Sequence, residues 1–159
     1  MSTGGPPVTM PLPTTTPKLN NPSSLPLTSH QTQLLTSLLS LFTGHCSPAQ
    51  LSYWSPDAVF ADPLTEARGH KQYAAQWYGL ANAFSKTEML DNRVTGVGNP
   101  MTLDLKMQYR VKGMPKDTEI KSEVRCWVDG EGKIERVEDR WEGNIPEGAI
   151  AKVSFSTGE

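Results

Sequence analysis

The stretch Met-Thr-Leu-Asp-Leu-Lys-Met-Gln-Tyr-Arg-Val-Lys, residues 101–112, decides the fold class of this chain. Its odd-numbered residues are all apolar or aromatic, and its even-numbered residues are all polar or charged. Successive side chains of a β-strand point to opposite faces, so this pattern predicts a strand with one buried and one wet face. Such strands are typical of an antiparallel sheet that covers a core on one side only.

Further strands are expected on both sides of this stretch. Residues 113–117 predict a turn into a strand over 119–128, and Asp-Gly-Glu-Gly at 129–132 predicts a tight hairpin into a strand over 133–141. Connections this short join antiparallel neighbours. A strand over 88–97 should precede the alternating stretch, although Asn92 and Arg93 interrupt its apolar residues.

The N-terminal half of the chain predicts helices. After Ser29, which we take as the N-cap, leucines and Phe42 recur at helical spacing until Gly44. Ser-Pro-Ala-Gln at 47–50 combines a capping Ser, a Pro at the first helical position and a Gln three residues after the cap, so it predicts a second, short helix. A short strand over 58–62 ends at Pro63, and an apolar stripe over 73–84 predicts the third helix.

Length and composition predict one domain with tails. Residues 1–28 hold seven of the 13 prolines and no aromatic residue, so they should form a disordered tail. The domain is expected over 29–145, with a C-terminal tail over 146–159. The net charge of −2 gives no reason to expect binding to nucleic acid or to an anionic membrane.

No membrane span, signal sequence or metal site is visible in the sequence. No stretch approaches the roughly 20 apolar residues that cross a bilayer, so a cytoplasmic protein is the default expectation. Cys46 and Cys126 lie far apart, which fits neither a disulfide framework nor a zinc site. We expect two free thiols, no metal and no cofactor.

Residues 53–63, Tyr-Trp-Ser-Pro-Asp-Ala-Val-Phe-Ala-Asp-Pro, stand between the second and third helices. Together with the order of the elements, this motif resembles the NTF2-like superfamily, which includes ketosteroid isomerases, scytalone dehydratases, SnoaL-type polyketide cyclases and nuclear transport factor 2. The resemblance implies an α+β cone, in which about three N-terminal helices pack on a curved, mixed but mostly antiparallel sheet.

The resemblance also implies a cavity between sheet and helices that binds a small hydrophobic molecule. Aromatic and sulfur-containing side chains on the expected inward faces could line this cavity, although each could equally fill the core. The expected pocket residues are Tyr53, Phe60, Trp77, Asn92, Met107, Tyr109, Asp139 and Trp141.

Asp62 is the first candidate for catalysis. It matches the Asp of the Asp-Pro pair that, in the ketosteroid isomerases, removes a proton next to a carbonyl. Asp62 shares a strand face with Phe60, so its carboxylate should point inward and have a raised pKa. The positions that match the isomerases' oxyanion donors fall on Leu38 and Val124, which cannot donate a hydrogen bond. Ketosteroid isomerase activity is therefore not favoured.

Three other polar residues are weaker candidates. His70, at the start of the third helix, is the best placed of the three histidines for proton transfer, as in a dehydratase, but a capping role is favoured. Asn92 and Asp139 lie on apolar strand faces, where each could orient a ligand or be satisfied by a neighbouring Arg. For Asp139, an ion pair with Arg125 or Arg140 is the favoured interpretation.

Three functions stay open at this stage. The first is a non-catalytic domain that binds a small hydrophobic ligand, and the second is a cofactor-independent isomerase, dehydratase or cyclase that uses Asp62 as a base on a steroid- or polyketide-like substrate. The third, by analogy of fold only, is a protein-binding module like a transport factor. Trp127 shares a strand face with several charged residues, and its exposure predicts a homodimer through the outer face of the sheet.

Overall fold

A six-stranded sheet and three helices make up residues 17–142, the part of the chain that the computed structural model describes. The helices are α1 (Ser29–Phe42), α2 (Pro48–Leu51) and α3 (Gly69–Ala83). The strands are β1 (Trp54–Ala61), β2 (Glu66–Arg68), β3 (Phe84–Val97), β4 (Met101–Val111), β5 (Asp117–Val128) and β6 (Ile134–Glu142). The predicted α+β class and the mixed sheet are thereby confirmed.

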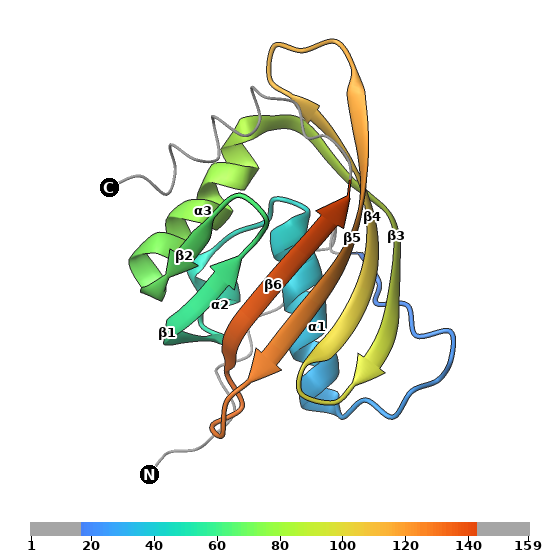
Figure 1. Ribbon diagram of the computed structural model, residues 1–159, viewed down its shortest axis with the longest axis vertical. Helices are drawn as coiled ribbons and strands as arrows, with labels where there is room; N and C mark the ends of the chain where they lie inside the picture. Colours follow the sequence, from blue (N-terminus) through green and yellow to red (C-terminus); the bar gives the residue numbers. More distant parts are fainter. Residues whose placement is uncertain (1–16, 143–159) are drawn as a thin grey trace.

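The strand order in the sheet is β2-β1-β6-β5-β4-β3. All neighbours are antiparallel except β1 and β6, which run parallel. In Figure 1 the sheet bends around α1, and α3 lies beside β1 and β2. The strand β2 was not predicted, because three residues are too few to show a period of two.

The helix starts follow the capping rules, with one correction. The N-cap of α1 is Thr28, one residue before the predicted Ser29, because the Thr28 hydroxyl accepts a bond from the Gln31 backbone while the Gln31 side chain bonds back to Thr28. This reciprocal pair satisfies two backbone N–H groups that the helix leaves free. For α2 the prediction is confirmed, since the Ser47 side chain caps the Gln50 N–H.

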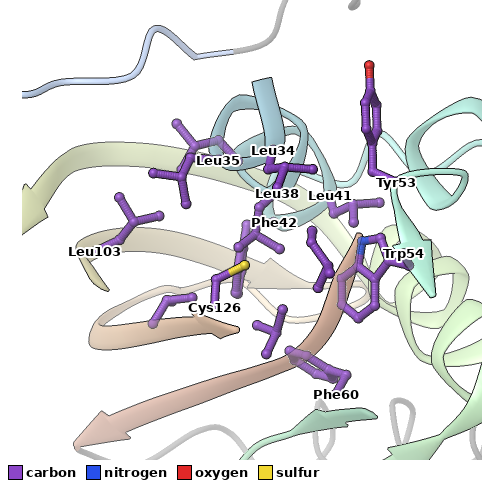
Figure 2. Packing of buried hydrophobic residues seen from close by; sticks show 14 of the residues in the cluster. Leu34, Leu35, Leu38, Leu41, Phe42, Tyr53, Trp54, Phe60, Leu103 and Cys126 are labelled. Atoms are coloured by element: carbon purple, nitrogen blue, oxygen red, sulfur yellow. The ribbon is translucent and has the colours of Figure 1, made fainter. Parts of the chain in front are cut away.

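The core lies between α1 and the concave face of the sheet. Leucines of α1 face sheet residues such as Leu103 and Cys126, as Figure 2 shows. Trp77 of α3 is 1% exposed and contacts three aromatic rings, whose centroids lie 5.0 Å (Phe42), 6.0 Å (Trp54) and 4.7 Å (Phe60) away. One side chain therefore ties α3 to α1 and to β1. Within residues 17–142, no helix is long and apolar enough to cross a membrane.

The segment before α1 is attached to the edge strand β3. Asn92 accepts a bond from the Asn20 N–H (2.8 Å) and donates one to the Lys18 carbonyl (3.0 Å), and the Val94 N–H donates to the Asn20 carbonyl (2.9 Å). These bonds continue the sheet at its edge and cover part of the exposed backbone of β3. Disorder was expected for residues 17–28 from their composition, but this part of the chain has specific contacts; residues 1–16 and 143–159 lie outside the described residues.

Replacement of Asn92 by Ala should release this segment. Two hydrogen bonds are lost, so the free energy of unfolding should fall by about 1–3 kcal/mol. Trypsin should also cleave after Lys18 faster than in the wild type, because the bond at its carbonyl no longer holds the chain against β3. The control is Asp91→Ala, at the exposed neighbouring position. Equal cleavage rates in both variants would contradict this role of Asn92.

Candidate functional site

Two carboxylates meet where β1 and β6 run side by side. The parallel ladder pairs Phe60 with Val137 and Ala61 with Glu138, so the next residues of the two segments are Asp62 and Asp139. Adjacent strands lie about 4.8 Å apart, and side chains at paired positions point to the same face. Asp62 and Asp139 are therefore neighbours on the concave face, although 77 positions of sequence separate them.

Asp139 is buried and forms no ion pair within residues 17–142. It is 8% exposed, and its Oδ1 has no hydrogen-bond partner among these described residues. Burial raises the pKa of Asp139 to about 7; a hydrogen bond with Ser122 lowers this pKa, and the negative charge of Asp62 raises it. Ser122 comes from β5, diagonally across from Asp139, because Val124 pairs with Asp139 and Ser122 pairs with Trp141. Asp139 therefore holds its proton to a much higher pH than an ordinary carboxyl group does.

Asp62 is held by the turn that follows β1. Its Oδ1 accepts bonds from the Leu64 N–H (2.8 Å), the Thr65 N–H (2.8 Å) and the Thr65 hydroxyl (3.1 Å). Burial raises the pKa of Asp62 above its usual value, and these three bonds partly offset that effect. One oxygen of Asp62 thus fixes the turn, and the orientation of the carboxylate is set by short-range contacts.

Tyr109 adds a phenol to the same face of the sheet. Burial raises the pKa of Tyr109 well above its usual value, and the negative charge of Asp139 raises it further. The Tyr109 ring lies 4.7 Å from that of Phe84. The phenol therefore stays protonated and can donate a hydrogen bond. We call Asp62, Tyr109, Ser122 and Asp139 the acidic site.

Two expectations for polar residues are wrong. The ion pair of Asp139 with Arg125 or Arg140 does not form, because both arginines lie on the opposite strand face, where they bind Glu123 and Glu138. Asn92 is buried as expected, but both polar atoms of its side chain bind the backbone of residues 18 and 20. It is therefore not free to orient a ligand.

Most of the other expected pocket residues are buried in the core, Tyr53 among them. Phe60, Trp77 and Met107 are almost fully buried in the core cluster, and Trp141 is partly buried next to Ser122 in the ladder. Tyr53 precedes β1 at the end opposite Asp62, and its hydroxyl points away from the cluster in Figure 2. Phe60 and Trp141 each lie next to the acidic site, since Phe60 is two residues before Asp62 and Trp141 two residues after Asp139 on the same strand faces.

His70 lies apart from these groups. It is exposed in the first turn of α3, where its ring stands 5.3 Å from that of Tyr73. No cluster of three or more His, Cys, Asp or Glu side chains suited to a metal ion occurs within residues 17–142. Cys46 and Cys126 are free thiols, as the sequence predicted.

Sequence reasoning missed Ser122 and the partnership of Asp139. Ser122 stands between Ile120 and Val124 at an inward position of β5, so the same rule that singled out Asn92 could have found it. In the sequence comparison, the position of the isomerases' oxyanion donor on a late strand falls on Val124, whose side chain cannot donate a hydrogen bond. In the structure, Asp139 is the cross-strand partner of Val124, so a carboxyl group stands directly beside that position.

Comparisons with known proteins agree on the fold. No family model matches the chain, and no curated protein matches it in sequence. Solved structures do match: a steroid delta-isomerase from Pseudomonas aeruginosa has 18% identity over 84% of this chain and 93% of its own, with a TM-score of 0.59. An NTF2-like protein from Anabaena variabilis has 16% identity over 76% and 96%, with a TM-score of 0.61.

A third solved structure has a similar fold. A SnoaL-like protein from Shewanella denitrificans has 17% identity over 69% of this chain and 88% of its own, with a TM-score of 0.59. At identities this low, the likeness concerns the path of the backbone, and chemistry has to be argued from the site itself.

Proposed function

Because the chain has an NTF2-like fold with two carboxyl groups side by side on its concave face, we propose that it binds a small, mostly apolar molecule at the acidic site. The observation that carries this proposal is the buried Asp139, whose Oδ1 has no hydrogen-bond partner in the part of the chain that the structure describes. A buried polar atom without a partner costs about 1–3 kcal/mol. A ligand that supplies the missing partner recovers this free energy on binding.

The surroundings of the acidic site suit an apolar ligand body. Phe60 lies two residues before Asp62 on the same strand face, and Tyr109 forms an aromatic pair with Phe84, with ring centroids 4.7 Å apart. Aromatic walls with few polar anchors are typical of small-molecule sites. In this proposal Asp139 is the polar anchor, Tyr109 is a second donor, and Ser122 holds the Asp139 carboxyl group in place.

A second candidate is acid–base catalysis of the isomerase, dehydratase or cyclase type on a steroid- or polyketide-like substrate. The observation that favours it is the pair of neighbouring carboxyl groups whose pKa values are both raised, that of Asp139 to about 7. Two such groups can serve as base and acid near neutral pH. Asp62 would remove the proton, and protonated Asp139 with Tyr109 would donate hydrogen bonds to the oxygen that becomes negative.

Ligand binding is tested by calorimetry and thermal unfolding with a hydroxysteroid such as testosterone, because its hydroxyl group can donate a hydrogen bond to Asp139 Oδ1. Replacement of Asp139 by Val should raise the Kd by about ten- to a hundredfold, because the polar anchor is lost while an apolar surface remains. The matched control is Glu138→Gln, one residue away on the opposite face, which should leave the Kd unchanged. Equal affinity of the Asp139→Val variant and the wild type would remove Asp139 from the proposed site.

Turnover by the same proteins separates the two candidates. If the acidic site catalyses a proton shift, Asp62→Asn should still bind 4-androstene-3,17-dione but lose conversion of the unconjugated isomer, 5-androstene-3,17-dione, by at least about a hundredfold. Conversion that Asp62→Asn leaves intact would exclude Asp62 as the base. The homodimer through the outer face of the sheet, where Trp127 is partly exposed, stays a prediction.

A further inference from the structure

Positive charge is confined to one face of the central strands. On β4, β5 and β6 the basic side chains lie on the convex face, next to acidic partners. The ion pairs there are Arg125 with Glu123 (2.9 Å), Arg136 with Glu138 (2.9 Å) and Lys106 with Glu119 (3.5 Å). Since side chains of a strand alternate between faces, this arrangement leaves the concave face of these strands without a basic residue.

The acidic site, on the concave face, has carboxyl groups but no basic partner within residues 17–142. Neither Asp62 nor Asp139 forms an ion pair with a Lys, Arg or His of residues 17–142. The charge that acts on Asp139 is that of Asp62, which is also negative. A buried carboxylate beside a half-buried one is unfavourable without a cation, because both are partly desolvated and the two charges repel each other.

We propose that the ligand of the acidic site carries a protonated amine, which binds between Asp62 and Asp139 while its apolar part lies against Phe60 and Tyr109. This inference rests on the proposed function and names the chemical class of the ligand. The independent observation is that Asp139 is more than nine-tenths buried and that its acceptor Oδ1 has no donor among residues 17–142. An ammonium group supplies both the missing donor and the missing positive charge.

Other ligand charges fit less well. A carboxylate or phosphate ligand would add a third negative charge at a desolvated place, and like charges there repel strongly. A neutral alcohol can donate to Asp139 Oδ1 but does not offset the negative charge of Asp62 or of ionised Asp139. The aromatic rings nearby also favour a cation, which is attracted to the face of an aromatic ring.

The pH dependence of binding follows from the same contacts. The groups that face Asp139 are Asp62 from the turn after β1, Tyr109 from β4 and Ser122 from β5. An ammonium ligand prefers ionised Asp139, so it displaces the proton that this group holds below neutral pH. Its affinity should therefore rise by about tenfold between pH 6 and pH 8, whereas the affinity of a neutral ligand should change little.

Three probes with one apolar skeleton test the proposal by calorimetry on the full chain: 1-naphthylmethylamine, 1-naphthylmethanol and 1-naphthoate. The amine should bind at least about tenfold more tightly than the alcohol, and the carboxylate most weakly. In Asp139→Asn the affinity for the amine should fall by about tenfold, while the affinity for the alcohol stays within about threefold. Glu138→Gln is the matched control and should bind all three probes like the wild type.

The outcomes separate this inference from the proposed function. Binding of the alcohol or the carboxylate as tightly as the amine would overturn the amine inference and leave a ligand site standing. An amine affinity that is equal in the wild type and in Asp139→Asn would also overturn it. If none of the three probes binds or raises the Tm, both the amine inference and the proposed ligand site fail.

Discussion

Replacement of Asp139 by Asn is expected to make the protein more stable at neutral and alkaline pH. The free energy of unfolding of the wild type should fall as the pH rises from about 4 to about 7. That of the variant should change much less over the same range. The reason is the burial of Asp139, which raises its pKa from 3.8 to about 7 in the folded protein. The folded state therefore binds the proton more tightly than the unfolded state over this range.

The sign and size of the effect follow from linkage. A carboxyl group with a raised pKa favours the folded state while it is protonated, and this contribution is lost as the pH rises through the folded-state pKa. A difference of about three pKa units corresponds to a free energy on the order of 4 kcal/mol. Asn has the same shape and no charge to desolvate, so it removes the cost of ionisation without leaving a cavity.

The measurement is urea unfolding at several pH values between 4 and 8. The control is Glu138→Gln, whose side chain lies on the opposite face and bonds to Arg136 and Arg140. The free energy of unfolding of this control should still fall between pH 4 and pH 7. Parallel curves for the wild type and Asp139→Asn would show that Asp139 titrates like an ordinary surface carboxyl group, which would contradict its buried position.

Replacement of Trp77 by Ala should destabilise the protein by about 3–5 kcal/mol. Trp77 is 1% exposed, and its ring contacts Phe42 of α1 and both Trp54 and Phe60 of β1. Truncation to Ala leaves a cavity at the place where α3, α1 and the sheet meet, and rigid neighbours close such a cavity only in part. A large part of the free energy that holds α3 to the sheet should be lost.

Thermal and urea unfolding measure this loss, and the midpoint should fall clearly in both. The matched control is Asn82→Ala, an exposed position of the same helix, where a change within about 0.5 kcal/mol is expected. A Trp77→Ala variant as stable as this control would mean that the aromatic cluster does not anchor α3.

The elements of the fold were predictable where the signal is local. The alternation over residues 101–112 placed β4, and the Ser47-Pro48 pair placed α2, because strand faces and helix caps depend on residues a few positions apart. The parallel pairing of β1 with β6 and the edge strand β2 were not predictable in this way. Both depend on partners distant in sequence or on runs too short to show a period.

The sequence by itself determined that Asp62 and Asp139 each lie on an inward strand face, since period two needs only the neighbouring residues. Only the tertiary structure decided that they are neighbours, that Ser122 bonds to Asp139 and that Arg125 and Arg140 point away from it. The physical reason is that register, burial and desolvation are properties of several chain segments together. The pKa of a carboxyl group, and with it the chemistry of the site, depends on those properties.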